Sequence, residues 1–391
     1  MTDASSVQSL SILRRLIACD TTSRNSNLEL IEYVKSYLDD LSIPYRLTYD
    51  DEGQKANLFA TVGEQGASGG YVFSGHSDVV PVDGQKWDTN PFELSEKDGK
   101  LYGRGTTDMK SFDAVVLAAL PEFARRGGNV PIHFSLSYDE EVGLVGVRRL
   151  IADMRENGIK PAGCIVGEPT NMKIVTSHKG KRSFRCHVHG LAAHSSLAPS
   201  GVNAVEYASA IISLLQKLAR QFRETGPFDA HYDCPHTTVH VGTVSGGSAL
   251  NIVPTECVFE FEFRHLPVDN PGEIFRKVRD YVDNDLLPEM QAVHPDASIK
   301  FETMAVIPYL DTDEDALVTQ LASQVLGDST LKKVSYNCEA CLFHEADVPT
   351  IICGPGDINQ AHKPNEYIEI DQIAKCEAFM RGFMERVCVA T

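Results

Sequence analysis

The chain has 391 residues, more than a single hydrophobic core usually covers, so its length favours two domains. Hydrophobic residues make up 42% and charged residues 23%, which is ordinary for a soluble globular protein. The net charge of -18 argues against nucleic acid or an anionic membrane as a partner, and no segment has the roughly 18 consecutive apolar residues of a membrane span. The first residues, MTDASSVQSL, lack the pattern of a secretory signal, so we expect a cytoplasmic protein.

Helical and strand patterns alternate in the first part of the chain. The predicted elements are helices within 6–42, 109–120 and 144–157, and strands at 45–49, 57–62, 70–76, 130–138 and 163–170. Strands that alternate with helices favour a doubly wound, mostly parallel sheet. We therefore predict an α/β domain that begins with residues 1–177.

The pattern changes near residue 178. The segment KRSFRCHVHG alternates polar and apolar residues, as is typical of a half-exposed antiparallel strand. A helix, two strands, a second helix and a fourth strand follow, which is the β-α-β-β-α-β order of a ferredoxin-like domain. We predict that this α+β domain covers residues 178–310 and is inserted into the larger α/β domain, whose second part covers 311–391.

The ten cysteines are scattered along the chain, and most lie in apolar strands or helices, so we expect buried free thiols. Cys338 and Cys341 form the C-x-x-C pair in NCEACLF, and a single pair is weak support for a zinc or redox site. The candidate functional groups are therefore histidines and acids.

Histidines and acids recur at positions that follow predicted strands. They are His76, Asp108, Glu140 with Glu141, Glu168 and His362. Positions 76, 108, 140 and 168 are separated by 32, 32 and 28 residues, close to the roughly 30 residues of a βαβ unit. Each group is thus expected near the carboxyl end of a strand, where open α/β sheets bind ligands. Imidazoles and carboxylates together suit zinc or manganese, and a shared carboxylate could bridge two ions.

Each of these residues also has a structural interpretation. A single His76 is more often a hydrogen-bonded histidine than a ligand, and Asp78 alone is usually a turn acid. Asp108 fits the N-cap of a helix, and Glu140 with Glu141 could complement a helix N-terminus. The regular spacing of the whole set argues instead for a shared site.

Six motifs give the chain a family resemblance, and in chain order they are SGHSDVVP, LYGRGTTDMK, SYDEEVG, VGEPT, HGLAAHSS and GPGDINQAH. Together they resemble the di-zinc family of aminoacylases, carboxypeptidases and deacylases over nearly the whole chain. HKG, HSSLAPSGVNAVEY and GPGDINQAHKPNEYIE are most similar to the members that act on N2-acetyl-L-ornithine. The segment NCEACLFHEADVPT matches the family only loosely.

The resemblance implies two divalent metal ions with one shared ligand. Asp108 would bridge the ions. His76 and Glu168 would complete the ligands of one ion, and Glu141 and His362 those of the other. The ions are expected to be Zn2+, with Co2+ or Mn2+ as alternatives.

The resemblance also implies the residues of catalysis. Asp78 would orient His76 from outside the ligand set. Glu140 would be the general base that takes a proton from the attacking water and gives it to the leaving amine. The peptide bond between Asp108 and Met109 is expected to be cis.

Three residues of the inserted domain have implied roles. His194, which could also be a helix-entry turn residue, would stabilise the oxyanion in the active site of a partner subunit. Asn251 and Arg264 would bind the α-carboxylate of the substrate, although an arginine on a strand is more often solvated. The inserted domain would thus be a lid and would build a homodimer.

The implied activity is hydrolysis of an N-acyl amino acid, with N2-acetyl-L-ornithine as the expected substrate, in arginine biosynthesis. A succinyl-diaminopimelate desuccinylase would need further cations, and HKGKRS supplies Lys179, Lys181 and Arg182. A general aminoacylase or dipeptidase is a further alternative. A non-catalytic metal-binding relative is the alternative from a different class.

Overall fold

The computed structural model describes residues 4–63, 69–127 and 130–388, which fold into two compact units. The first unit comprises Met1–Ser177, Leu310–Lys332 and Cys338–Thr391, and the second comprises His178–Tyr309 and Lys333–Asn337. The predicted division differs at Leu310, which belongs to the first unit, and at Lys333–Asn337, which belong to the second unit although the prediction placed them in the second part of the larger domain. The assignment of the units as catalytic domain and lid stays a prediction.

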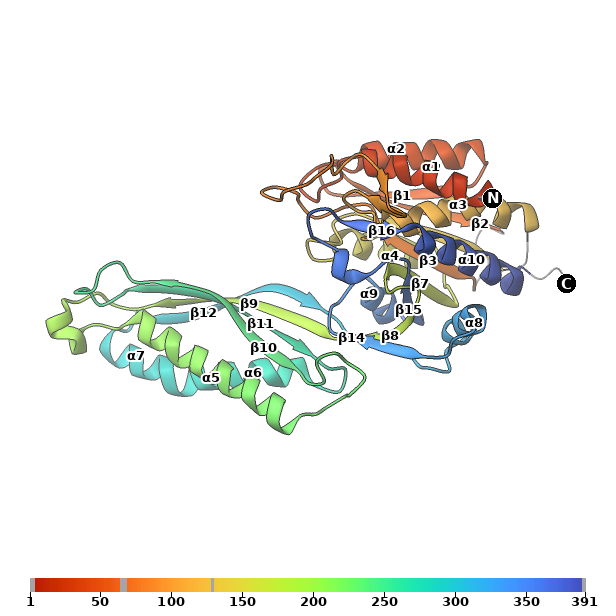
Figure 1. Cartoon of the computed structure of the whole chain (residues 1–391). Coiled ribbons are helices and arrows are strands. Elements are labelled where there is room, and N and C mark those ends of the chain that lie inside the picture. Colours follow the sequence, from red (N-terminus) through yellow and green to blue (C-terminus); the bar gives the residue numbers. More distant parts are fainter. Residues whose placement is uncertain (1–3, 64–68, 128–129, 389–391) are drawn as a thin grey trace. The chain divides into compact units, whose positions relative to one another are not determined.

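The first unit is built on a mixed sheet (Figure 1), which has nine strands within the described residues. In order across the sheet they are β1 (Tyr45–Tyr49), β2 (Ala56–Val62), β6 (Ile132–Ser137), β3 (Tyr71–His76), β7 (Gly163–Pro169), β15 (Thr350–Gly354), β8 (Ile174–His178) and β13 (Leu310–Asp311), with β14 (Leu331–Val334) paired to β8. The central strands β6, β3, β7 and β15 are parallel. β1 and β2 on one side and β8 on the other are antiparallel to their neighbours. The predicted α/β class is confirmed, with antiparallel flanks that the sequence did not reveal.

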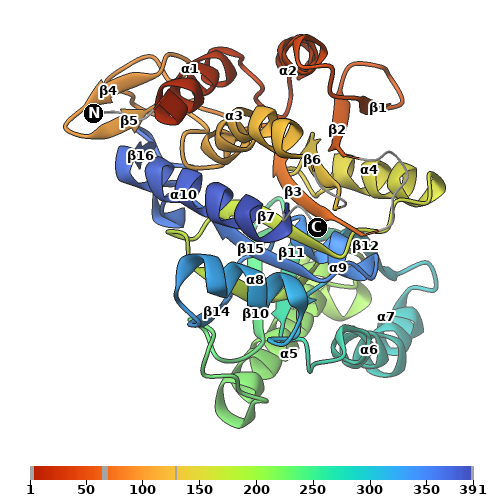
Figure 2. The ribbon, with the colours of Figure 1, turned by 90° about the vertical axis from the view of Figure 1, so that its right-hand side faces the viewer.

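Helices cover both faces of this sheet (Figure 2). They are α1 (Ala4–Ala18), α2 (Leu28–Asp40), α3 (Lys110–Arg126), α4 (Val145–Glu156), α8 (Leu317–Leu326), α9 (Ala340–Glu345) and α10 (Ile370–Val387), with the short 3-10 helix η3 (Ile358–Gln360). α1, α2, α3, α8 and α10 share one core, and α4 and α9 pack on the opposite face. A small sheet of β16 (Tyr367–Glu369), β5 (Lys100–Tyr102) and β4 (Ser95–Lys97) completes the unit.

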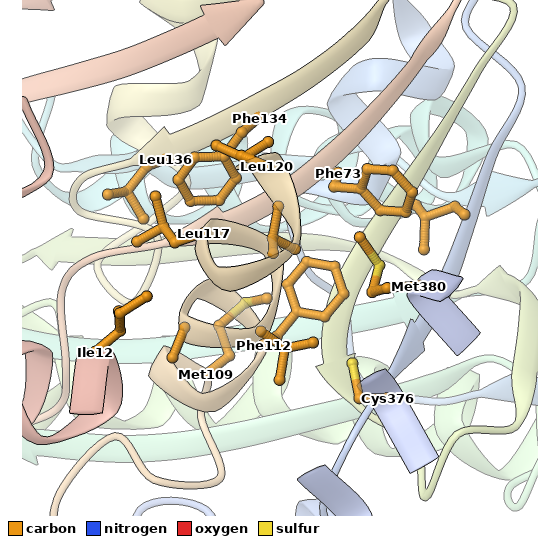
Figure 3. Packing of buried hydrophobic residues seen from close by; sticks show 14 of the residues in the cluster. Ile12, Phe73, Met109, Phe112, Leu117, Leu120, Phe134, Leu136, Cys376 and Met380 are labelled. Carbon is orange, nitrogen blue, oxygen red and sulfur yellow. The ribbon is translucent and has the colours of Figure 1, made fainter. Parts of the chain in front are cut away.

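The main core surrounds α3, whose apolar side chains meet those of β3, β6 and α10 (Figure 3). Every residue of β3 is buried because the strand lies at the centre of a sheet that is covered on both faces. Phe73 packs on this core, while His76 ends the same strand without any exposed surface. The buried strand therefore places a polar group at the edge of the sheet.

The second unit has the topology predicted from its sequence. Its strands are β9 (Gly180–His189), β10 (Thr238–Gly246), β11 (Glu256–His265) and β12 (Ser298–Ile307), and they lie in the order β10-β11-β9-β12. Its helices are α5 (Ala204–Thr225), α6 (Pro271–Tyr281), α7 (Leu287–Val293) and the short η1 (Ser195–Ser200) and η2 (Val282–Leu286). This is the strand order of a ferredoxin-like domain.

The sheet of the second unit has one apolar face and one charged face. Phe184 and Phe261 point to the core that the sheet shares with α5 and α6. On the other face, Arg185 pairs with Glu260 and Glu302. This alternation along β9 is the pattern that the sequence predicted.

Within the described residues, no helix combines the length and the apolar composition needed to cross a membrane. The ten cysteines are free thiols, and Cys338 and Cys341 are both buried in the first unit.

Candidate metal centre

The predicted histidines and acids lie at the carboxyl ends of the parallel strands. His76 is the last residue of β3, Glu168 lies near the end of β7, and Glu140 follows the end of β6 by three residues. Asp108 comes just before α3. Since parallel strands end at the same edge of a sheet, these side chains come together there.

Two groups of ligand-type side chains form at this edge and share Asp108. One group is His76, Asp108 and Glu168, and the other is Asp108, Glu141 and His362; within each group the candidate ligand atoms lie within 4.8 Å of one another. Asp108 Oδ1 lies 3.1 Å from His76 Nε2, and Asp108 Oδ2 lies 3.1 Å from His362 Nε2. Each oxygen of one carboxylate thus faces a different imidazole, as a bridging ligand requires.

Carboxyl groups outnumber imidazoles among the predicted residues at this edge. Burial, and then the charge of Glu168, raise the pKa of Glu140 well above its usual value. Burial and the charge of Asp108 do the same to Glu168. Hydrogen bonds with Asp108 and Glu141 raise the pKa of His362 to about 10. Divalent cations would offset this surplus of negative charge, and the nitrogen and oxygen donors suit zinc or manganese, so the residues fit two such ions.

Asp78 is buried and contacts His76 mainly through its backbone carbonyl. His76 Nδ1 lies 2.9 Å from the backbone carbonyl of Asp78 and 3.6 Å from its carboxylate. The carboxylate instead accepts hydrogen bonds from Ser23 Oγ at 2.7 Å and from the backbone N–H groups of Glu140 at 3.0 Å and Glu141 at 3.3 Å. Asp78 therefore contacts both the imidazole of His76 and the turn that carries Glu140 and Glu141.

Glu140 is buried and belongs to neither ligand group. Its carboxyl group is therefore not among the candidate metal ligands. The Asp108–Met109 peptide is cis, as predicted. The interpretation of Asp108 as a helix cap is wrong, because α3 begins after Met109 without a side-chain cap.

Two buried acids beside this edge were missed from the sequence. Glu339 accepts hydrogen bonds from Ser74 Oγ and Ser137 Oγ, both at 2.6 Å, so it links β3 to β6 behind the ligands. Glu366 follows His362 by four residues and is 1% exposed. An acid between two buried cysteines, as in NCEAC, is the signal that could have revealed Glu339.

His194 and Asn251 are neighbours on exposed loops of the second unit. His194 and Ile252 form an isolated β-bridge, and Ser195 N donates to the carbonyl of Asn251 at 3.0 Å. His194 Nδ1 accepts a hydrogen bond from Ser196 N at 3.2 Å, so the histidine also caps η1. The structural interpretation of His194 as a turn residue thus holds without excluding a catalytic role.

Arg264 lies at the opposite end of the second unit. Its Nε donates to Glu262 at 3.0 Å and its Nη1 to Asn337 Oδ1 at 3.3 Å. Asn251 lies in the loop between β10 and β11, so most of β11 separates it from Arg264, roughly 25 Å at about 3.3 Å per residue. The two side chains cannot bind the same carboxylate within one chain.

Sequence comparison connects the chain with a known family. The model of Peptidase family M20/M25/M40 matches residues 72–386. The acetylornithine deacetylase of Edwardsiella ictaluri (strain 93-146) is 31% identical over 387 residues, which cover 97% of each protein.

Solved structures show the same fold. Aminopeptidase PepT of Bacillus cereus ATCC 10987 matches with a TM-score of 0.76 and 21% identity, covering 98% of this chain and 99% of that one. The YXEP protein of Bacillus subtilis, described as a dinuclear metal binding peptidase, matches with a TM-score of 0.69 and 14% identity, covering 98% of this chain and 99% of that one. At these identities the similarity establishes the fold alone.

Proposed function

Because the chain belongs to peptidase family M20/M25/M40 and is a metallohydrolase acting on amide bonds, we propose that it removes the acyl group from an N-acyl amino acid. The resemblance predicted from the six motifs is thereby confirmed. The proposed substrate is N2-acetyl-L-ornithine, which gives L-ornithine and acetate in arginine biosynthesis, in line with the name of the Edwardsiella relative. The observation that carries the proposal is the pair of ligand groups that share Asp108, with Glu140 buried next to them.

We infer that two divalent ions bind to these groups, with Zn2+ as the expected ion and Co2+ or Mn2+ as alternatives. His76 and Glu168 would hold one ion, Glu141 and His362 the other, and Asp108 both. When bound, the ions supply Lewis-acid polarisation of the scissile carbonyl and acidify the attacking water.

Glu140 is the proposed general base. Its buried carboxylate would take a proton from the attacking water and then give this proton to the amine that leaves, so one group serves both halves of the reaction. Asp78 supports this role because it accepts hydrogen bonds from the backbone of Glu140 and Glu141. It thereby fixes the turn from which the base projects.

Substrate recognition is proposed to need two copies of the chain. Arg264 would bind the α-carboxylate of the substrate, which suits a planar guanidinium, and Glu262 and Asn337 hold it in place. Asn251 and His194 lie at the other end of the second unit. In a homodimer built through this unit, they would reach the site of the partner, where His194 would stabilise the developing oxyanion.

The contacts of Lys179 reduce the number of cations that could bind the second carboxylate of a succinyl substrate. Lys179 is buried and its Nζ donates to the carbonyl of His236 at 2.5 Å. Lys181 forms an ion pair with Glu262 at 3.0 Å. Lys181 is engaged no more firmly than Arg264, which pairs with the same Glu262, so of these two lysines only Lys179 is withheld from a second carboxylate on the substrate.

The test is an assay of the metal-loaded protein with N2-acetyl-L-ornithine, succinyl-diaminopimelate and a panel of dipeptides. We expect the highest kcat/KM with N2-acetyl-L-ornithine. A higher value with another compound would reassign the substrate, and no turnover at full metal content would identify a non-catalytic relative. A cytoplasmic location stays a prediction.

A further inference from the structure

Glu366 is a buried acid that collects four hydrogen bonds from one loop. Its Oε1 accepts from the backbone N–H groups of Thr107 at 2.8 Å and Asp108 at 3.1 Å. Its Oε2 accepts from the backbone N–H of Gly105 at 3.1 Å and from Arg104 Nη1 at 2.5 Å. The backbone of the shared ligand Asp108 is thus bound directly by this carboxylate.

The loop Gly103–Asp108 depends on Glu366 because it has no strand or helix to satisfy its backbone. It lies between β5 and α3, and Gly105 has a φ of 87°, a left-handed conformation that suits glycine. Thr107 Oγ1 also donates to the carbonyl of Tyr367 at 2.6 Å. Without the carboxylate, buried N–H groups would lose their acceptor, which is costly in a protein interior.

The same network reaches His362 from the other side. Arg104 Nη2 donates to Gln85 Oε1 at 2.8 Å, and Gln85 Nε2 donates to the carbonyl of His362 at 2.9 Å. Trp87 Nε1 donates to Gln85 Oε1 at 3.1 Å and so fixes the amide. Glu366 follows His362 by four residues, so the backbone between these two residues closes a ring of contacts that also contains Arg104 and Gln85.

We propose that Glu366 is a positioning residue that binds the loop of Asp108 to the loop of His362. Through this clamp, two ligands that are far apart in sequence are set by one buried carboxylate. Glu366 touches neither substrate nor ion in this role. It acts through the backbone of Asp108 and, by way of Arg104 and Gln85, through the carbonyl of His362.

The clamp predicts an asymmetry between the two metal sites, and this part rests on the metal centre of the proposed function. The site of Asp108, Glu141 and His362 has two of its three ligands on clamped loops. The site of His76, Asp108 and Glu168 has one. Loss of the clamp should therefore weaken metal binding more at the site that contains His362.

The test is Glu366→Gln, which keeps the size of the side chain but puts an amide NH2 against backbone N–H groups. In the metal-free protein, we expect the amides of Gly105, Thr107 and Asp108 to exchange with deuterium about tenfold faster or more, since their acceptor is weakened. In titrations with Zn2+ alone, the dissociation constant of one ion should rise by about tenfold, with a smaller change for the other, and Gln85→Ala should affect the same ion.

Two variants separate this role from a general loss of structure. Glu339→Gln alters another fully buried acid, but one that accepts from Ser74 and Ser137, so exchange at the three loop amides should not change. Gln85→Ala removes the hydrogen bonds of this amide with His362, Arg104 and Trp87 but leaves the four hydrogen bonds of Glu366, so it should weaken one ion without faster exchange at those amides. It also tests the link if Glu366→Gln fails to fold.

Unchanged exchange at the three amides in Glu366→Gln would overturn the clamp. Equal weakening of both ions in Glu366→Gln, or wild-type affinities in Gln85→Ala, would overturn the asymmetry. A wild-type protein that binds a single ion would contradict the metal centre of the proposed function, while the exchange measurement would still decide the clamp.

Discussion

Asp78 contacts three parts of the candidate centre at once. Its carbonyl faces the imidazole of His76, and its carboxylate holds the backbone of Glu140 and Glu141. A carboxylate that accepts several hydrogen bonds stays ionised, and burial makes it keep those partners. The side chain therefore fixes the direction of a proposed ligand and of the proposed base together.

Glu140→Gln tests the assignment of the base. Gln has nearly the same shape but cannot accept the proton of the water, so kcat should fall by about a thousandfold or more. Both ions should remain, because Glu140 is in neither ligand group. Steady-state kinetics with metal analysis checks this, and Glu156→Gln, at an exposed acid, is the control. Activity within about tenfold of the wild type would show that another group is the base.

His133 gives a pH dependence that is separate from the metal centre. Burial lowers the pKa of His133 in the folded protein to about 4, whereas the unfolded chain has the ordinary value of about 6.5. Below pH 6.5 the unfolded state therefore binds more protons, and stability is lost as the pH falls towards 4. Between pH 7 and pH 5 this group should cost about 2 kcal/mol of unfolding free energy.

His133→Phe should remove this loss. The stacking on Phe59 is kept by the aromatic ring, although the hydrogen bond with Thr61 is lost. Urea unfolding of the metal-free proteins at pH 7 and pH 5 measures the difference, and His240→Phe, at an exposed histidine, is the control. An equal pH dependence in wild type and His133→Phe would contradict the assignment.

At the scale of elements, the contact between β7 and α3 positions Glu168. A Cβ added at Gly167 would lie 2.0 Å from Cγ of Phe112, which is on α3. Gly167→Ala should therefore lower the free energy of unfolding by about 1–3 kcal/mol, as overpacking does. Urea unfolding measures this, and the double variant with Phe112→Leu should recover part of the loss because the two sites are coupled. If Gly167→Ala has the same free energy of unfolding as the wild type, α3 can shift away from β7 without cost.

The elements differ in how far the sequence determines them. β3 and β11 were predictable because each leaves a local sequence pattern. β3 is buried on both faces and begins with a continuous apolar run, whereas β11 is buried on one face and alternates polar with apolar residues. The small sheet of β4, β5 and β16 was not, since its strands have three residues each and β16 pairs with β5 over a separation of more than 260 residues.

The same distinction applies to the candidate site. The grouping of the candidate ligands could be predicted because each one follows a strand or belongs to a motif. Glu366 could not, because its partners are backbone N–H groups more than 250 residues earlier, and backbone donors leave no trace in a sequence. The distance in space between Asn251 and Arg264 was also not evident from the sequence. The two residues are close in sequence, but most of the ten extended residues of β11 lie between them.

At the scale of the whole molecule, the second unit has features that favour self-association. β10 and β12 are the edges of its sheet, and open edges tend to be paired or covered. Leu197, Val244 and Leu250 are exposed near the end that carries His194 and Asn251. A twofold contact through this unit would extend the sheet and bury apolar surface. It would also bring the end of one unit that carries His194 and Asn251 close to the end of its neighbour that carries Arg264.

Subunit exchange between two inactive variants tests this arrangement. His194→Ala lacks the proposed oxyanion donor, and Glu140→Gln lacks the proposed base. If His194 acts in the partner's site, a mixed dimer has one site with both groups intact and one site with neither. After complete exchange of equal amounts, half of the dimers are mixed, so activity should return to about a quarter of the wild-type value. Each variant mixed with itself is the control, and exchange is followed by mass spectrometry of differently tagged chains. If exchange is complete and no activity returns, His194 serves its own chain or has no catalytic role, and the homodimer is not needed for the site.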